Sequence, residues 1–149
     1  MSEKTDVKDN PSDSICSELS DNDYPGSGTI IIMDDEEYIR DSLSDMLMCM
    51  GYDVIHMEEG GEVISFLKGK HSGDEKISGI ILDLVIPGGM GGKDAAAEIQ
   101  KLTPHIPVFV ISGYSDDPVM VNPREYGFTD GLSKPFLIKD LADMLGKYL

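Results

Sequence analysis

The chain has 149 residues, a formal net charge of −16 and two cysteines. This length suits one domain with a single apolar core, and so strong a negative charge repels nucleic acids and anionic membrane surfaces. The longest apolar run is interrupted by Asp83 and the N-terminus lacks the basic and apolar regions of a signal peptide, so the sequence predicts no membrane span and favours a cytoplasmic location.

The first 27 residues differ in composition from the rest of the chain. They contain seven acidic residues and two lysines among many Ser, Asn, Pro and Gly residues, with little to bury. This composition is typical of a disordered acidic tail or linker, so the folded domain is expected over residues 28–149. Cys16 and Cys49 have neither CxxC nor metal-ligand spacing, which favours a reducing cytosol over a disulfide scaffold.

From residue 29 onward, short apolar runs alternate with segments of helical periodicity. The pattern predicts strands at 29–33 and 52–57, one ending at residue 83, and two more at 106–113 and 128–133; helices are predicted at 36–50, 61–68 and 93–102. Pro123 predicts a short or broken fourth helix, and the final helix is expected to bury Leu137, Leu141, Leu145 and Tyr148. Five strands alternating with five helices favour an α/β fold, a doubly wound five-stranded parallel sheet in a three-layer sandwich.

Polar side chains follow several of these strands. Asp34 and Asp35 come after the first strand, Asp83 ends the third, Ser112 ends the fourth and Lys134 follows the fifth. In doubly wound sheets, function gathers beyond the carboxyl ends of the strands. Three carboxylates gathered there need a divalent cation to be stable as anions, and oxygen-only ligands indicate Mg²⁺ or Mn²⁺.

A metal, an ammonium group and a hydroxyl around a carboxylate suit phosphoryl transfer. Lys134 would offset charge on the phosphoryl oxygens, Ser112 would donate a hydrogen bond to one of them, and a carboxylate oxygen would attack phosphorus in line. Asp83 is the candidate nucleophile, because it stands alone at the end of the central strand whereas Asp34 and Asp35 are paired as metal ligands would be.

These residues resemble the receiver domains of two-component response regulators. The resemblance covers about residues 29–149 and depends on "MDDE", "LDLVIPGGMGG", "ISG" and "SKPF" occurring in this order after successive strands. It implies a flavodoxin-like fold in which Asp83 accepts the phosphoryl group and Ser112 and Lys134 contact it. It further implies that Mg²⁺ is bound directly by Asp35, Asp83 and the Val85 carbonyl, with Asp34 holding a metal-bound water, and that the Lys134–Pro135 bond is cis.

The resemblance also implies partners and a mode of action. The phosphoryl donor would be a histidine kinase or a histidine phosphotransfer domain, and the domain would catalyse its own phosphorylation and dephosphorylation without turning over a separate substrate. Phosphorylation would alter the surface around the fourth helix and fifth strand, which is also the expected homodimer face. The segments "GGMGGKDA" and "SGYSDDPVMVNPREYGF" resemble receivers at the C-terminal ends of hybrid sensor histidine kinases more than those of transcription factors.

The chain departs from the pattern of receivers in two places. The loop after Asp83 has one extra glycine, Gly88 or Gly89, and Gly131 stands where receivers carry an aromatic switch residue. Val85 and Tyr114 flank the route of the attacking water and are poorly suited to activate it, so the sequence predicts slow hydrolysis of the phosphoryl aspartate.

Two rival functions remain open. The chain is alternatively a pseudo-receiver that docks partners without phosphorylation, although all five site residues are present. It is also comparable to a small Mg²⁺-dependent phosphatase with an aspartate nucleophile, of the haloacid-dehalogenase type, although such enzymes need a second acid where this chain has Val85. A P-loop reading of "GGMGGK" fails, because Asp94 stands where Ser or Thr is required.

Overall fold

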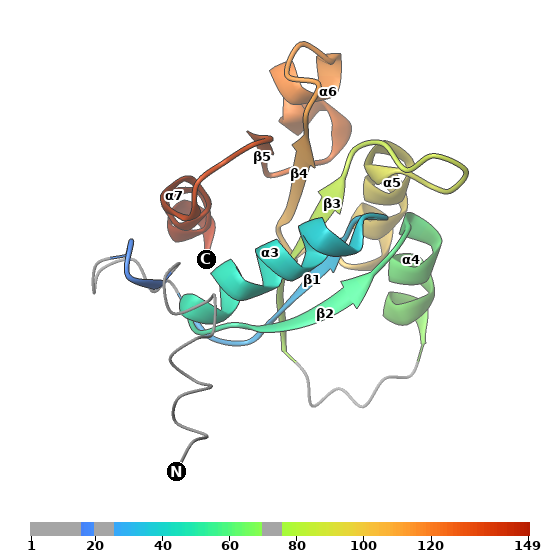
Figure 1. Cartoon of the computed structure of the whole chain (residues 1–149). Coiled ribbons are helices and arrows are strands. Elements are labelled where there is room, and N and C mark those ends of the chain that lie inside the picture. The colour runs from blue at the N-terminus through green and yellow to red at the C-terminus, as the bar shows by residue number, and fades with distance from the viewer. Residues whose placement is uncertain (1–15, 20–25, 70–75) are drawn as a thin grey trace.

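A computed structural model describes residues 16–19, 26–69 and 76–149 (Figure 1). Along the chain it contains β1 (Thr29–Met33), α3 (Glu37–Cys49), β2 (Asp53–Met57), α4 (Gly60–Lys68), β3 (Ile77–Asp83), α5 (Gly92–Leu102), β4 (Val108–Ser112), α6 (Pro118–Val121), the 3₁₀ helix η2 (Pro123–Tyr126), β5 (Asp130–Ser133) and α7 (Ile138–Tyr148). The strands form one sheet in the order β2-β1-β3-β4-β5, and every neighbouring pair is parallel. The predicted doubly wound α/β fold is therefore confirmed.

The apolar strands are buried on both faces of the sheet. Ile31 and Met33 of β1 point into a core cluster that includes side chains of α4 and α5, whereas Ile30 and Ile32 point into a second cluster that includes side chains of α3 and α7. A strand whose alternate side chains meet helices on opposite sides has no position for a polar residue. This explains the unbroken isoleucine run.

The helices begin and end close to the predicted positions. In α3, Arg40, Leu43 and Leu47 are buried, as expected for one face of an amphipathic helix. Asp117 accepts a hydrogen bond from the Val119 amide at the start of α6, and the chain then breaks into η2, as the prolines predict. In the part of the chain that the structure describes, no helix is long and apolar enough to cross a membrane.

Two details of the sequence interpretation are wrong. Leu137 precedes α7 and is 65% exposed, because the helix begins one residue later and its buried face is formed by Ile138, Leu141 and Leu145. Cys16 and Cys49 form a disulfide, so the interpretation against disulfide pairing fails. The spacing of two cysteines along the sequence does not reveal how close their side chains lie in the fold. The disordered tail over 1–27 stays a prediction, because residues 1–15 and 20–25 lie outside the described part.

Candidate functional site at the carboxyl ends of the strands

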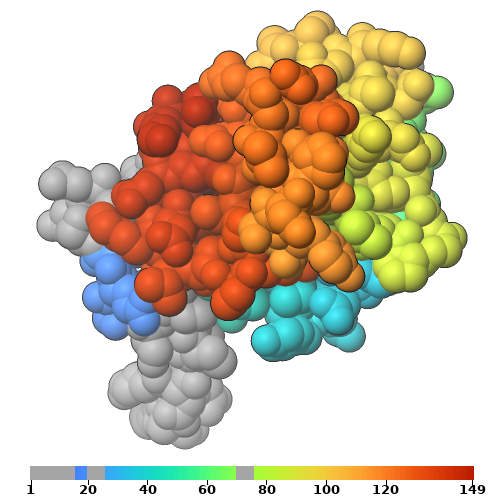
Figure 2. All heavy atoms as spheres, turned by 90° about the horizontal axis from the view of Figure 1, so that it is seen from above, coloured from blue at the N-terminus to red at the C-terminus, as the bar shows by residue number. Residues whose placement is uncertain are grey.

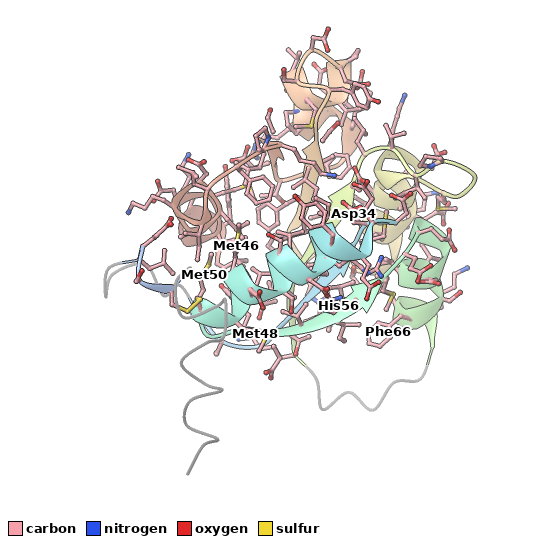
Figure 3. The ribbon with its side chains drawn as sticks, in the orientation of Figure 1. Asp34, Met46, Met48, Met50, His56 and Phe66 are labelled. Atoms are coloured by element: carbon pink, nitrogen blue, oxygen red, sulfur yellow. A yellow bond between two sulfur atoms is a disulfide. The ribbon has the colours of Figure 1, made fainter. Side chains whose placement is uncertain are left out.

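Three carboxylates converge where β1 and β3 end. Asp34 follows β1 and is fully buried, Asp35 is exposed, and Asp83 is the last residue of β3 and is 7% exposed. One carboxylate oxygen from each lies within 4.8 Å of the others. The parallel register of β1 and β3 brings these positions together, since Met33 pairs with Leu82. Figure 3 shows Asp34 at the end of β1, beside the first turn of α3.

Lys134 supplies the positive charge facing two of these carboxylates. Its Nζ lies 3.0 Å from Asp34 Oδ2 and 3.5 Å from Asp83 Oδ2. The lysine follows β5, and its amide donates a hydrogen bond of 2.8 Å to the Ser112 carbonyl at the end of β4. The Lys134–Pro135 peptide bond is cis, which confirms the expectation from the sequence.

Burial and the neighbouring charges shift two pKa values in the site. Burial first, and then the charge of Asp34, raise the pKa of Asp83 to about 7, against a smaller lowering by the charge of Lys134. Burial alone would lower the pKa of Lys134, but its hydrogen bond with Asp34 and the charge of Asp83 outweigh this effect, so the pKa is raised. The lysine is therefore charged at neutral pH, while Asp83 needs further positive charge to be fully ionised.

Ser112 lies next to this cluster but is not part of it in the structure. It is 1% exposed at the end of β4, where Asp83 pairs with the preceding residue, Ile111. Its Oγ accepts a hydrogen bond of 3.0 Å from the Tyr114 amide, so the hydroxyl proton remains available to another acceptor. Tyr114 itself is 60% exposed.

Val85 flanks Asp83 with its backbone. A hydrogen bond from the Val85 backbone to the Asp83 carboxylate opposes the rise of the Asp83 pKa. Val85 is 45% exposed, and its apolar side chain offers the site no hydrogen-bonding group.

Glycines close the lengthened loop after Asp83. Gly88 has a φ of +78°, which only glycine adopts without strain, so this residue makes the extra turn. At Gly92 a Cβ atom would lie 2.7 Å from the Asp83 carbonyl oxygen, and at Gly91 another would collide with the Leu84 carbonyl oxygen. The insertion therefore bulges into solvent, and the start of α5 still packs against the end of β3.

Sequence reasoning missed two residues that hold the site in place. The buried guanidinium of Arg40 donates a hydrogen bond of 2.6 Å to the Asp34 carbonyl oxygen and lies 4.0 Å from Glu58. The Glu59 carboxylate accepts hydrogen bonds from the amides of Gly61 and Met90, which joins the start of α4 to the loop after β3. A signal existed for Arg40, because it stands three residues before Leu43 on the inner face of α3.

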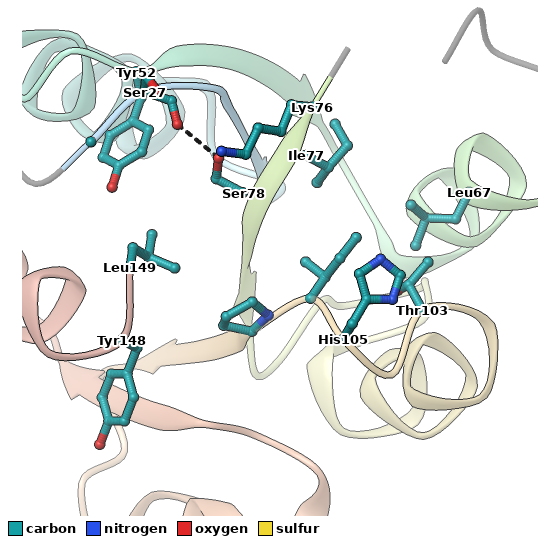
Figure 4. Close-up of a pocket in the computed structure, with 13 residues that line it drawn as sticks. Ser27, Tyr52, Leu67, Lys76, Ile77, Ser78, Thr103, His105, Tyr148 and Leu149 are labelled. Carbon is teal, nitrogen blue, oxygen red and sulfur yellow. Dashed lines mark hydrogen bonds between the residues drawn. The ribbon is translucent and has the colours of Figure 1, made fainter. Parts of the chain in front are cut away.

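A hollow of about 790 Å³ lies at the amino ends of the strands, at the opposite end of the sheet from the acidic cluster (Figure 4). Its described lining includes Tyr52, Lys76, His105 and Leu149, and no acidic side chain. Two of its lining residues are joined by a hydrogen bond, which the Ser78 hydroxyl donates to the Ser27 carbonyl oxygen (dashed line in Figure 4). The acidic cluster and this hollow are thus separate features.

The arrangement around Asp83 agrees with the family that most of the chain matches. A family model described as "Response regulator receiver domain" matches residues 30–146. The chain belongs to this family. It is therefore a receiver domain of two-component signalling, homologous to response regulators.

Curated relatives of this receiver domain are longer proteins. Nodulation protein W of Bradyrhizobium diazoefficiens is 29% identical over 114 residues, which are 76% of this chain and 48% of that protein. Sensor kinase CckA of Brucella abortus is 30% identical over 130 residues, which are 85% of this chain and 13% of the kinase. The DNA-binding transcriptional regulator NtrC of a Bradyrhizobium species is 29% identical, and this chain covers 24% of it. The chain spans about half or less of the length of these relatives.

Solved structures show the same fold. The receiver domain of a sensor histidine kinase from Pseudomonas aeruginosa, which has a magnesium ion coordinated in its active-site cleft, superimposes with a TM-score of 0.70 at 20% identity. The match covers 83% of this chain and 98% of that one. A CheY-like receiver from Methanospirillum hungatei gives the same TM-score at 24% identity, covering 82% of this chain and 93% of that one.

Proposed function

We propose that this receiver domain accepts a phosphoryl group from a phosphohistidine onto Asp83 in a Mg²⁺-dependent reaction and thereby switches a protein-interaction surface. The observation that carries the proposal is the position of Lys134 Nζ, 3.5 Å from Asp83 Oδ2, beside three carboxylates whose oxygens lie within 4.8 Å of one another. One lysine does not neutralise three acids, and the surplus negative charge matches what a divalent cation requires.

The donor set suits Mg²⁺, with Mn²⁺ as the alternative. Asp34, Asp35 and Asp83 would hold the ion together with the Val85 carbonyl oxygen, and the bound ion would offset negative charge on the phosphoryl oxygens. All of these ligands are hard oxygen donors, which fit both cations. The exposure of Asp35 leaves one side of the cluster open to solvent and to a phosphoryl donor.

The chain's own residues supply the transfer step. An Asp83 carboxylate oxygen attacks phosphorus in line, and the bond between phosphorus and the partner's imidazole nitrogen breaks. Lys134 stabilises charge on the transferred group from the side of β5. Ser112 turns its hydroxyl proton toward a phosphoryl oxygen, since the hydrogen bond that its Oγ makes within the described residues is one that it accepts, from the Tyr114 amide.

The phosphoryl donor is a histidine kinase or a histidine phosphotransfer domain. A groove of about 200 Å³ runs beside Lys134 between the start of α3 and the segment before α7. Apolar side chains, among them Ile39, Met46 and Phe136, line it together with the exposed Tyr38. An apolar groove next to the attacking group suits a partner helix that carries the phosphohistidine.

The switched surface is the region of α6 and β5, which is also the proposed homodimer face. Phosphorylation adds negative charge at Asp83 and draws Ser112 at the end of β4 toward it. The usual aromatic switch residue has no room at position 131. Even a Cβ atom added to Gly131 would lie 2.8 Å from Val110 Cγ1. The exposed Tyr114 next to Ser112 lies at the rim of the surface that changes.

Incubation with acetyl phosphate and Mg²⁺ tests the proposal. We expect intact mass spectrometry to show the gain of one phosphate in the native protein and in an Asp94→Asn control, whose exposed acid lies outside the site, but not in Asp83→Asn. An unphosphorylated native protein would favour the pseudo-receiver, and continuous turnover of a general phosphate ester would favour the phosphatase. Omission of Mg²⁺ is expected to abolish the mass gain.

A further inference from the structure

We propose that Arg40 is a positioning residue for the Mg²⁺ site, because its guanidinium holds the peptide group between Asp34 and Asp35 and thereby aims the Asp35 carboxylate at the ion. The inference deepens the proposed function and rests on it. Arg40 lies in the first turn of α3 and is buried. Its Nη1 donates a hydrogen bond of 2.6 Å to the Asp34 carbonyl oxygen, and this carbonyl shares one planar peptide group with the Asp35 amide.

Each polar group of Asp34 has a hydrogen-bond partner. Its amide donates to the Met57 carbonyl oxygen at the end of β2, its Oδ1 accepts from the Glu36 amide, and its Oδ2 accepts from Lys134 Nζ. Arg40 provides the partner of the carbonyl oxygen. A buried carbonyl that loses its partner costs free energy, so the peptide group would turn toward water or another donor if the guanidinium were removed.

The Asp35 carboxylate lacks such restraints. It is exposed, and within the described part of the chain it accepts no hydrogen bond and forms no ion pair. Figure 2 shows α3, which begins two residues later, at the molecular surface (cyan). The direction of a side chain without partners depends on its backbone, so the peptide group ahead of Asp35 decides whether the carboxylate meets the ion. Mg²⁺ demands near-ideal octahedral geometry, which makes a tilted ligand costly.

Ion pairing does not account for the buried guanidinium. Arg40 Nη2 lies 4.0 Å from Glu58 Oε2, and the Glu58 side chain is 68% exposed, so this pair is weak. The charge of Arg40 and its hydrogen bond act on a bound cation in opposite directions. The positive charge repels Mg²⁺, whereas the hydrogen bond to Asp34 arranges the ligands that hold it. Removal of the guanidinium therefore shows by its sign which effect dominates.

Calorimetric titration of the full chain with MgCl₂ at pH 8 measures that sign. Arg40→Met keeps the length of the side chain without its charge or its donors, and we expect it to weaken Mg²⁺ binding by about 10- to 100-fold, as expected when a residue that orients metal ligands is lost. Arg40→Lys keeps the charge and one donor group and is expected to recover most of the affinity. Lys101→Met is the control, because it removes an exposed positive charge in the last turn of α5, and its affinity should stay within about twofold of the native value.

A measurement without metal tests the positioning directly. In the Mg²⁺-free protein we expect Arg40→Met to lower the NMR order parameter of the Asp35 amide from about 0.85, the value of a rigid backbone, to about 0.6. The amides of β1 and β3 are expected to keep their order parameters and their protection from hydrogen exchange. If Arg40→Met does not fold, the neutral and shorter Arg40→Gln takes its place in both experiments, with the same expected changes.

Four results would overturn the inference. Equal or tighter Mg²⁺ binding by Arg40→Met would show that the guanidinium acts through its charge alone. Weaker binding with an unchanged order parameter at Asp35 would show that it does not hold this peptide group, and Arg40→Lys that binds no better than Arg40→Met would show that the donated hydrogen bond is not the cause. A native protein that binds no Mg²⁺ at all would overturn the proposed function together with the inference, which distinguishes this failure from the other three.

Discussion

Replacement of Asp83 by asparagine removes an ionisable group that is destabilised as an anion in the folded protein. Burial and the neighbouring Asp34 raise the pKa of Asp83 from 3.8 to about 7. Each pKa unit corresponds to about 1.36 kcal/mol, so ionised Asp83 costs the metal-free fold about 4 kcal/mol. Asparagine keeps the shape of the side chain without this charge. We therefore expect Asp83→Asn to be more stable than the native protein at neutral pH in the presence of a chelator.

The difference must depend on pH in a defined direction. Below pH 3.8 the Asp83 carboxyl is protonated in both the folded and unfolded states, and its charge costs nothing. Between about pH 4 and pH 7 the unfolded state loses this proton and the folded state keeps it, so native stability falls as pH rises. Above about pH 7 both states are ionised and the deficit stays constant. The advantage of Asp83→Asn should grow across this window and then level off.

Urea unfolding in EDTA at several pH values between 4 and 8.5 measures this difference, with Asp94→Asn as the control. The full difference of about 4 kcal/mol in unfolding free energy would also appear in thermal unfolding, as a rise in the unfolding temperature of about 8 to 16 °C for a protein of this size. Addition of Mg²⁺ at pH 8 should stabilise the native protein more than Asp83→Asn. An Asp83→Asn variant that is equal to or less stable than the native protein at pH 8 without metal would refute the reasoning, because the anionic cluster would then carry no cost.

The remaining predictions concern single side chains. Lys134→Met leaves two buried carboxylates without their cation, so we expect a loss of about 3 kcal/mol in unfolding free energy and no phosphorylation by acetyl phosphate, checked by urea unfolding and intact mass. Gly92→Ala places a methyl group 2.7 Å from the Asp83 carbonyl oxygen and is expected to lower the unfolding free energy by more than about 1 kcal/mol. Gly146→Ala in α7, where the added methyl group meets open space, should raise the unfolding free energy by about 0.5 to 1 kcal/mol in the same urea assay. Tyr52→Phe removes a buried hydroxyl that has no hydrogen-bond partner among the described residues, so thermal unfolding should show equal or slightly higher stability. The phosphoryl aspartate should hydrolyse slowly, because Val85 and Tyr114, which flank the route of the attacking water, are poorly suited to activate it. A half-life of seconds in purified protein would contradict this.

The sequence was most informative where one physical constraint acts alone. A carboxylate that interrupts an apolar strand has few places to go in a parallel sheet, so Asp83 and its approach to Asp34 were predictable from the pattern of strands. The same holds for Lys134, which follows the last strand. Leu137 was misplaced because helical periodicity extends one residue beyond the point where the backbone becomes helical.

Other features depend on distances that no local pattern encodes. The disulfide between Cys16 and Cys49 requires the chain before the sheet to return to the end of α3. The need for glycine at Gly92 arises from the approach of the Asp83 carbonyl oxygen, which depends on how α5 packs against β3. The hydrogen bond from Arg40 to the Asp34 carbonyl likewise exists only once α3 is docked on the sheet.

The contacts of Lys134 span the whole domain. The lysine is 100 positions from Asp34 and 51 from Asp83, and the three residues follow or end different strands of one sheet. No fragment that lacks the first or last strand can assemble this group of charges. The proposed phospho-acceptance would therefore require complete folding, and in any collection of variants the fraction that takes up acetyl phosphate is expected to report how much of each preparation is native.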